Sequence, residues 1–383
     1  MITAGTYAIV TEHFARSVAA TTGFFEDESR RVAECCRRMA DHFNRGGTLF
    51  VMGEGAQASD AQHVAVEFVH PVIVGKRALP AVWVPDIAAS ASDIVMALAT
   101  DEVPPLVRVA LSEARDAGAV TILITGGAVQ PEPAADCHFR IGDANALVIQ
   151  EVSETLYHVL WELVHVFFET DDAHLMAFLP QSAGSRPVDL IAEVQASTMA
   201  KAREICTLRA AVDDRSGARI VEAGRAIAER IRSNGKLLAF GNGGSATDAQ
   251  DVAADCFAPP ISSWRRLRAM SLTNDVSIIT AIGNDVGFEH VFSRQIIAFG
   301  RATDVAIGFS TSGASRNLAA AMTEARSRGL LTIALSGGDG GEMARSAAVD
   351  FCFTAPSEHL PRIQEAHATI WHALLSVVQE ELR

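Results

Sequence analysis

Hydrophobic and polar positions follow two alternating patterns along most of the chain. In the second half, the short apolar runs KLLAFG, VAIGFS and LLTIALSGG each end in glycine or serine. Between them lie SATDAQDVAADCF and ASRNLAAAMTEARSRG, whose apolar residues recur three and four positions apart, as in amphipathic helices. Continuous apolar strands that alternate with helices predict a parallel sheet covered by helices on both faces.

The same pattern occurs twice. GGTLFVMGEGAQASDAQHVAVEF resembles NGKLLAFGNGGSATDAQDVAADCF, which pairs Gly47 with Gly235 at an offset of 188 residues. SEARDAGAVTILITGG pairs with TEARSRGLLTIALSGG at an offset of 211, and IQEVSETLYH pairs with IQEAHATIWH at an offset of 214. The order is kept while the offset grows, which indicates a duplication whose first copy is shorter in its middle.

These patterns predict two tandem domains, each a flavodoxin-like three-layer α/β sandwich. We place an N-terminal domain at 1–175, a linker at 176–188 and a C-terminal domain at 189–383, because Pro, Gly and Ser interrupt the helical pattern around the linker. Amphipathic helices are expected to open the halves, over 13–43 in the first and over 190–212 and 219–235 in the second.

A hydroxyl-rich loop follows one of the predicted strands. The loop STSGAS contains Ser310, Thr311, Ser312 and Ser315 and directly precedes a predicted helix. Free N–H groups at a helix N-terminus, together with hydroxyls, form a phosphate site, although an ordinary serine N-cap is the alternative. The chain has no G-x-x-x-x-G-K-[ST] motif, so we expect no nucleotide cofactor.

A glycine-rich turn, FGNGGSATDAQ, follows another predicted strand. Its glycines allow close backbone approach, and Ser245 and Asp248 are expected to cap the next helix. Since ligands bind at the carboxyl ends of parallel strands, this turn and the hydroxyl-rich loop are predicted to form two walls of one sugar-phosphate pocket.

The segments GNGGSATDAQ, NDVSIITAIGNDVGFEHVFSRQI, GFSTSGASRNLAAAM, LSGGDGGEMA and RIQEAHATIWH resemble the phosphoheptose isomerase family of the SIS sugar-isomerase fold. The resemblance implies an aldose–ketose isomerase that converts sedoheptulose 7-phosphate to D-glycero-D-manno-heptose 7-phosphate through an enediol(ate). It implies a substrate-binding set that comprises Asn242, Gly243, Ser245, Asn284, Asp285, Ser310, Thr311, Ser312, Ser315 and Gln364.

The family also implies a metal and acid–base set of His, Glu, Gln and His. In the first half these positions are His63, Glu67, Gln150 and His158; in the second half they are Asp251, Asp255, Gln364 and His372. Nitrogen and carboxylate ligands suit zinc, so a divalent metal, zinc by preference, is expected at the first-half set before the second-half set. The expected catalytic residues are Glu67, His158, Asp255 and His372.

The two halves have kept different parts of the family pattern. Where the second half has its hydroxyl-rich loop, the first half has Asp101 and Glu102, which would repel phosphate. One hypothesis is therefore a composite site, in which the second half binds phosphate while Glu67 and His158 transfer protons. A site within the second half and a non-catalytic sugar-phosphate-binding or protein-interaction regulator are the alternatives, and an isomerase of another phosphosugar is a further one.

Composition restricts the partners. The 383 residues carry a formal charge of −14, which argues against general nucleic-acid binding. No apolar run is long enough for a membrane span and no signal peptide is evident, so a cytoplasmic location is expected. The six scattered cysteines predict no disulfides. Family analogy implies a homo-oligomer, a dimer of the two-domain chain.

Overall fold

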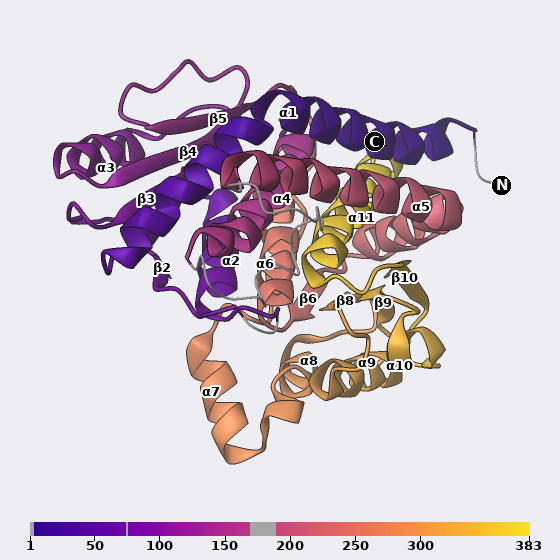
Figure 1. Ribbon diagram of the computed structural model, residues 1–383. Coiled ribbons are helices and arrows are strands. Elements are labelled where there is room, and N and C mark those ends of the chain that lie inside the picture. The colour runs from indigo at the N-terminus through magenta and orange to yellow at the C-terminus, as the bar shows by residue number, and fades with distance from the viewer. Residues whose placement is uncertain (1–3, 74–75, 169–188) are drawn as a thin grey trace. The chain divides into compact units, whose positions relative to one another are not determined.

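The computed structural model describes residues 4–73, 76–168 and 189–383 (Figure 1). Its contacts divide the chain into a first unit, Ser17–Cys206, and a second unit, Met1–Arg16 with Thr207–Arg383. The chain passes between the units within two long helices, α1 (Ala4–Asn44) and α5 (Leu190–Arg232). These bounds differ from the predicted domain bounds, and the predicted linker 176–188 lies outside the described residues.

The helix α5 is longer than the sequence pattern indicates. The stretches 190–212 and 219–235 were expected as separate helices, yet residues 190–232 form one continuous helix. The intervening residues contain Gly217 but no proline. A single glycine costs a helix only about 1 kcal/mol, whereas proline costs about 3 kcal/mol, so nothing in this segment ends the helix.

The first unit contains a five-stranded parallel sheet in the order β2-β1-β3-β4-β5. The strands are β1 (Leu49–Gly53), β2 (Ala81–Trp83), β3 (Ile94–Leu98), β4 (Val120–Gly126) and β5 (Cys137–Ile141). The helices are α2 (Gln57–Val69), α3 (Pro105–Asp116) and α4 (Ala146–Val164), followed by the 3-10 turn η1 (His165–Phe167). One hydrophobic core contains residues of α2 and α4, and a second contains residues of α3. The sheet is therefore covered on both faces.

The second unit contains an equivalent parallel sheet in the order β7-β6-β8-β9-β10 (Figure 1). Its strands are β6 (Leu237–Gly241), β7 (Ala269–Ser271), β8 (Val305–Ser310), β9 (Leu331–Gly337) and β10 (Phe351–Ala355). Its helices are α6 (Gly244–Phe257), α7 (Val276–Asp285), α8 (Ser293–Phe299), α9 (Arg316–Ser327), α10 (Gly341–Arg345) and α11 (Leu360–Glu381), with the 3-10 turn η3 (Phe288–His290). Helices α8, α9 and α10 lie on one side of the sheet and α6 and α11 on the other. The predicted α/β fold of two similar sandwiches is confirmed.

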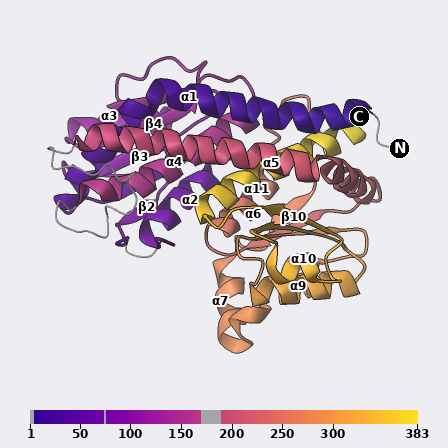
Figure 2. The ribbon, with the colours of Figure 1, turned by 45° about the vertical axis from the view of Figure 1, so that its right-hand side comes forward.

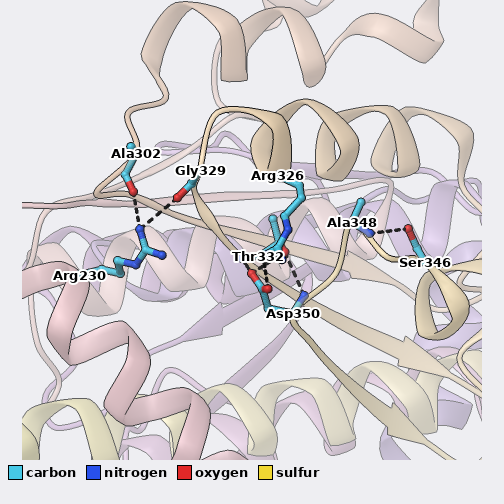
Figure 3. Close-up of polar contacts among 8 residues, drawn as sticks. All are labelled: Arg230, Ala302, Arg326, Gly329, Thr332, Ser346, Ala348 and Asp350. Atoms are coloured by element: carbon cyan, nitrogen blue, oxygen red, sulfur yellow. Dashed lines mark hydrogen bonds and ion pairs between the residues drawn. The ribbon is translucent and has the colours of Figure 1, made fainter.

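A polar clasp recurs at the amino ends of both sheets. In the second unit, the N–H of Thr332 donates to the Asp350 carboxylate at 3.0 Å, and the N–H of Asp350 donates to the Thr332 hydroxyl at 3.0 Å (Figure 3). In the first unit, Thr121 and Asp136 make the same two bonds at 3.0 and 2.9 Å. The aligned threonines therefore make the same contacts in both halves. In each sheet they join the start of the fourth strand to the residue just before the fifth strand.

Helix α7 extends away from the sheet of its own unit (Figure 2). None of its residues is buried, and Val276 at its start is 70% exposed. Phe288, in the turn that follows, is 59% exposed. This part of the second unit therefore presents apolar side chains to the solvent.

Two further sequence expectations concern cysteines and membrane spans. All six cysteines are free thiols, as predicted, and Cys35, Cys36, Cys137 and Cys256 are buried. Within the described part of the chain, every helix is too short or too polar to cross a lipid bilayer.

Candidate functional site

The hydroxyl-rich loop connects the end of β8 to the first turn of α9. The N–H of Gly313 donates to the Ser310 hydroxyl at 3.1 Å, and the two hydroxyls of Ser310 and Ser315 lie 3.2 Å apart. The N–H of Ala314 donates to the Ser312 hydroxyl at 3.3 Å. Gly313 has φ +62°, and a Cβ there would lie 2.2 Å from the carbonyl oxygen of Gly340. Hydrogen bonds of the serine hydroxyls thus hold the loop in its conformation, and only glycine fits at position 313.

A pocket of about 280 Å³ opens beside this loop. Its lining residues come from the carboxyl ends of β8 and β9 and from the start of α11: Thr311, Ser312, Gly337, Gly338, Asp339, Ser357, Glu358, Leu360 and Ile363. Asp339 accepts a hydrogen bond from the N–H of Gly341 and pairs with Arg345, and both interactions lower its pKa. The predicted phosphate-binding residues Thr311 and Ser312 therefore face a cavity of the size of a small ligand.

Asn242 of the glycine-rich turn is held by a residue that the sequence analysis did not single out. Its Nδ2 donates to Oδ1 of Asn317 at 3.0 Å, and Nδ2 of Asn317 donates back to Oδ1 of Asn242 at 2.8 Å. Asn317 lies in the first turn of α9 and lines a second pocket, of about 360 Å³, with Arg316 and Phe288. The only sequence signal for Asn317 was its place in the motif STSGASRN.

The glycine-rich turn differs from the prediction in how α6 begins. Gly243, at φ +58°, is the N-cap residue, and as a glycine it has no side chain that could cap the helix. Ser245 and Asp248, the expected capping residues, are instead buried in the first turns of α6. A Cβ at Gly241 would lie 2.0 Å from the carbonyl oxygen of Ser245, so only glycine fits at this position of the turn.

Asn284 and Asp285 were expected in a substrate-binding turn. The structure places both at the C-terminal end of α7, where they are exposed and bonded to each other at 2.8 Å. Neither residue lines the two pockets described above. The apolar and β-branched run from Val276 to Ile282 continues as a helix through the Gly-Asn-Asp sequence, so the expected turn does not form there.

The second-half acid–base residues meet between α6 and α11. Oδ2 of Asp255 accepts a hydrogen bond from Nε1 of Trp371 at 2.9 Å and lies 3.8 Å from Nε2 of His372. Burial raises the pKa of Asp255, while the nearby His372 and the Trp371 hydrogen bond oppose this shift. Gln364 is buried on α11 and Asp251 is half-buried on α6. The structure therefore pairs Asp255 with His372, as the sequence analysis expected.

The first-half set meets between α2 and α4 of the first unit. Nε2 of His63 lies 3.4 Å from Nε2 of His158 and 3.8 Å from Oε1 of Glu67, and all three side chains are buried. Burial lowers the pKa of His63 well below its usual range, and the neighbouring His158 lowers it further. Burial raises the pKa of Glu67, against the opposing effect of His158. Gln150, the remaining predicted ligand, is half-buried.

Glu154 is a member of this cluster that the sequence analysis missed. The ligand atoms of His63, Glu154 and His158 all lie within 4.8 Å of one another, and all three residues are buried. The described residues thus include a group able to hold a metal ion. Glu154 precedes His158 by four residues, so the i, i+4 rule that paired His63 with Glu67 would have identified it on α4 as well.

The first-unit counterpart of the hydroxyl-rich loop lies between β3 and α3. Asp101 and Glu102 are exposed there, just before the helix begins. The Thr100 hydroxyl accepts a hydrogen bond from Nε2 of Gln57 at 2.8 Å. Two carboxylates in front of a helix N-terminus occupy the place that an anionic ligand would take.

Comparisons with known proteins relate this chain to isomerases of phosphorylated sugars. A family model described as the SIS domain matches residues 202–337. The phosphoheptose isomerase of Roseiflexus sp. (strain RS-1) is 42% identical over 197 residues, which cover 50% of this chain and 93% of that protein. The phosphoheptose isomerase of Geotalea daltonii is 46% identical over 156 residues, which cover 41% of this chain and 80% of that protein.

A solved structure extends the likeness in fold to the whole chain. The C-terminal domain of glucosamine-fructose-6-phosphate aminotransferase from Francisella tularensis superposes with a TM-score of 0.60 over 98% of this chain and 96% of that chain, at 10% identity. At this identity the likeness shows the fold alone. The sequence matches, which cover most of the length of each relative, show that the chain belongs to the phosphoheptose isomerase family.

Proposed function

We propose that the protein is an aldose–ketose isomerase that converts sedoheptulose 7-phosphate to D-glycero-D-manno-heptose 7-phosphate. Family membership supports a phosphosugar isomerase. The observation that carries the proposal is the loop from Ser310 to Ser315, which places hydroxyls at a helix N-terminus beside a pocket of about 280 Å³. Carboxylate–histidine pairs, the groups that aldose–ketose isomerisation requires, are buried in both units.

The phosphate is proposed to bind in the pocket next to Thr311 and Ser312. Helix α9 directs the positive end of its dipole toward this loop, which favours an anion without a lysine or arginine. His372 lies nine residues beyond Ile363 on α11, an axial separation of the two residues of about 13.5 Å at 1.5 Å per residue. The phosphate pocket and the acid–base pair of the second unit thus lie at different levels along α11, as a substrate with its phosphate and its carbonyl at opposite ends requires.

The chemistry needs one base and one acid. A carboxylate removes a proton from C1 of the ketose while a histidine gives a proton to the C2 carbonyl oxygen, which yields an enediol. The carboxylic acid then returns its proton to C2, and the histidine takes the proton of the C1 hydroxyl, so that the aldose forms with no net gain or loss of atoms. A carboxylate whose pKa is raised holds such a proton more readily at neutral pH.

Two carboxylates qualify as the base. Asp255 is already engaged by Trp371 and His372 through one oxygen, Oδ2. Glu67 has a buried oxygen, Oε2, with no hydrogen-bond partner among the described residues, and its longer side chain has more reach. These contacts favour Glu67 as the base, with His158 as its partner acid. The composite site, in which this pair serves a phosphate held by the second half, stays a prediction.

Isosteric variants test which carboxylate acts. The Glu67→Gln and Asp255→Asn variants would be assayed with sedoheptulose 7-phosphate, next to the exposed control Glu113→Gln. Loss of at least about 100-fold in kcat in Glu67→Gln alone, in the range ascribed to general acid–base catalysis, supports the first-half base. Full activity in Glu67→Gln together with loss in Asp255→Asn would place the base in the second half.

A divalent metal is proposed to bind the buried histidines of the first unit, with zinc as the preferred ion because imidazole and carboxylate ligands suit it. When bound, such an ion would polarise the substrate oxygens or order the site. His63 and His158 would then hold the ion, so that with the metal bound His158 would be a ligand and not the acid, and Glu67 would move the proton.

A regulator that binds sugar phosphates without turnover is the second candidate. The hydrogen bond from Trp371 to Asp255 favours it, because a carboxylate so engaged is less free to act as a base. Calorimetry with sedoheptulose 7-phosphate, combined with a turnover assay, separates the two functions. Binding without turnover would support the regulator and contradict the isomerase.

We also propose that the chain forms a homo-oligomer, a dimer by analogy with the family. The exposed apolar residues Val276 and Phe288 support a surface that another copy covers. Light scattering of the purified protein measures the oligomeric state, and a monomer at micromolar concentration would contradict the proposed dimer.

A further inference from the structure

Glu358 contributes a carboxylate to the pocket beside the hydroxyl-rich loop. Two of the residues that line this pocket are acidic, Asp339 and Glu358, and none of the described lining residues is a lysine or an arginine. Asp339 accepts a hydrogen bond from the N–H of Gly341 and pairs with Arg345. Glu358 is exposed and has no hydrogen bond or ion pair with the residues that the structure describes. Its carboxylate is therefore the charged group of the lining that is available to a ligand.

The loop that carries Glu358 is fixed at the edge of the pocket. Glu358 lies between β10 and α11. The N–H of Gly338 donates to the carbonyl oxygens of Ala355 and Ser357 at 2.9 and 3.1 Å. The N–H of His359 donates to the Ser357 hydroxyl at 3.1 Å. These bonds hold the backbone on both sides of Glu358, while its side chain stays exposed.

The same glycine segment connects this loop to the hydroxyl-rich loop. Gly337 precedes Gly338 at the end of β9, and a Cβ at Gly337 would lie 2.3 Å from the carbonyl oxygen of Thr311. The segment thus packs against Thr311 through Gly337 and is bonded to Ser357 through Gly338. In a pocket of about 280 Å³, a ligand whose phosphate is held by the hydroxyl-rich loop has its next carbon atoms near Glu358.

The negative charge of Glu358 determines which ligand groups it attracts. An ionised carboxylate only accepts hydrogen bonds, so it binds hydroxyls of a ligand and repels a second phosphate. Hydrogen bonds to a charged acceptor are also stronger than those between neutral groups. We propose that Glu358 is a specificity-determining residue, which accepts hydrogen bonds from hydroxyls on the carbons next to the phosphate ester. The pocket then selects monophosphates of polyhydroxylated compounds over simple phosphate esters and over bisphosphates.

This role of Glu358 deepens the proposed function and rests on its phosphate site. In sedoheptulose 7-phosphate the hydroxyls in question are those of C6 and C5, at the opposite end of the chain from the carbonyl. They take no part in the proton transfers at C1 and C2. A residue that holds them stabilises the bound substrate and the transition state alike, so its removal raises KM more than it lowers kcat.

The experiment compares two phosphate esters of equal charge. Ethyl phosphate carries no hydroxyl, whereas glycerol 3-phosphate carries hydroxyls on the two carbons after the ester carbon, and both are dianions in mildly alkaline solution. Isothermal titration calorimetry gives the ratio of their affinities. In Glu358→Leu the preference for glycerol 3-phosphate should fall about 10-fold or more, the factor that a hydrogen bond to a charged group contributes. Both esters lose the same repulsion in this variant, so the ratio isolates the hydrogen bonds.

Glu358→Gln and Glu342→Leu are the matched comparisons. Glu358→Gln keeps a neutral acceptor of similar shape, so its ratio should lie between those of the natural protein and Glu358→Leu. Glu342 is exposed on α10 and is not among the residues that line the pocket, so Glu342→Leu should leave the ratio unchanged. An unchanged ratio in Glu358→Leu would overturn the proposal, and so would an equal fall in Glu342→Leu. Failure of the natural protein to bind either ester would overturn it together with the phosphate site.

Turnover of sedoheptulose 7-phosphate separates this inference from the proposed function. In an active isomerase, Glu358→Leu should raise KM more than it lowers kcat. A reduced affinity ratio in a protein without turnover would support the role of Glu358 and contradict the isomerase. Turnover by a protein whose ratio is unchanged in Glu358→Leu would contradict the role of Glu358 and leave the isomerase in place.

Discussion

Nε1 of Trp371 donates a hydrogen bond of 2.9 Å to Oδ2 of Asp255, and both side chains are buried. In the first unit, the aligned position of α4 holds Tyr157, whose hydroxyl is bonded to Asp60 and His63. The carboxylates Glu67 and Asp255 therefore occupy matching sequence positions but have different neighbours. Asp255 is held through its Oδ2 by the hydrogen bond from Trp371, whereas Oε2 of Glu67 has no hydrogen-bond partner among the described residues.

Replacement of Trp371 by phenylalanine should destabilise the protein through this bond. Without the indole N–H, the buried Asp255 carboxylate loses a hydrogen-bond donor, which should cost about 1–3 kcal/mol in the free energy of unfolding. Urea denaturation monitored by circular dichroism measures the loss.

Trp161→Phe is the matched control, because Trp161 is equally buried but its Nε1 has no hydrogen-bond partner among the described residues. Both variants lose the same volume from a core, and Trp161→Phe also weakens the contact of its ring with Nζ of Lys76, 4.6 Å away, so a larger loss in Trp371→Phe reports the hydrogen bond. Equal losses in the two variants would show that the bond to Asp255 contributes nothing.

A carboxylate in the hydroxyl-rich loop should weaken phosphate binding. Ser312 is exposed and lines the pocket, and Ser312→Asp copies Asp101, the aligned residue of the first half. Repulsion between like charges at the helix N-terminus should weaken binding of inorganic phosphate at least about 10-fold, since a close like charge costs on the order of 1 kcal/mol or more. Isothermal titration calorimetry measures the affinity. Thr323→Asp, an exposed change in the middle of α9, should retain it; equal weakening in both variants would refute a local phosphate site.

The two hydrogen bonds between the side-chain amides of Asn242 and Asn317 should contribute to stability jointly. Asn242→Ala and Asn317→Ala each break both hydrogen bonds, so the double variant should lose little more stability than either single one, with a coupling energy of about 0.5–3 kcal/mol. Denaturation of all four proteins completes the cycle. Similar phosphate affinities in the two single variants would make Asn242 a positioning residue, whereas a larger loss in Asn242→Ala would restore its predicted role as a ligand.

Stability should fall in mildly acidic solution because of His367. Burial lowers its pKa to about 4 from an ordinary value of 6.5. Between these values the unfolded chain binds a proton that the folded protein does not, so the stabilisation is complete above pH 6.5 and is lost as the pH falls toward 4. The loss should reach about 3 kcal/mol at 1.36 kcal/mol per pKa unit. His367→Leu should make the profile of unfolding free energy against pH less steep, while the buried His138 and His165, whose pKa values are also lowered to about 4, keep a remaining slope. His290→Gln, a partly exposed control, should leave the profile unchanged. An unchanged slope in His367→Leu would exclude His367 as its source.

Most of the fold could be predicted from local pattern. The strands around KLLAFG, VAIGFS and LLTIALSGG were expected and are β6, β8 and β9, because short uninterrupted apolar runs that end in Gly or Ser and alternate with helices are typical of a covered parallel sheet. The repeat predicted two similar sandwiches, and the clasps of Thr121 with Asp136 and of Thr332 with Asp350 show that the aligned residues do the same work. The residues of the hydroxyl-rich loop were found because a loop between a strand and a helix is defined within a few neighbouring positions.

The sequence by itself determined the fold class, the family and the pairing of Glu67 with His63 and of Asp255 with His372. Only the tertiary structure decided which partners those groups meet. Glu154 joins the histidines because α2 and α4 pack together, Asn317 holds Asn242 because β6 and β8 are neighbours, and Trp371 holds Asp255 because α6 packs on α11. Periodicity along one element shows which residues share a face, but hydrogen bonds between elements depend on side-chain directions that are set when those faces pack.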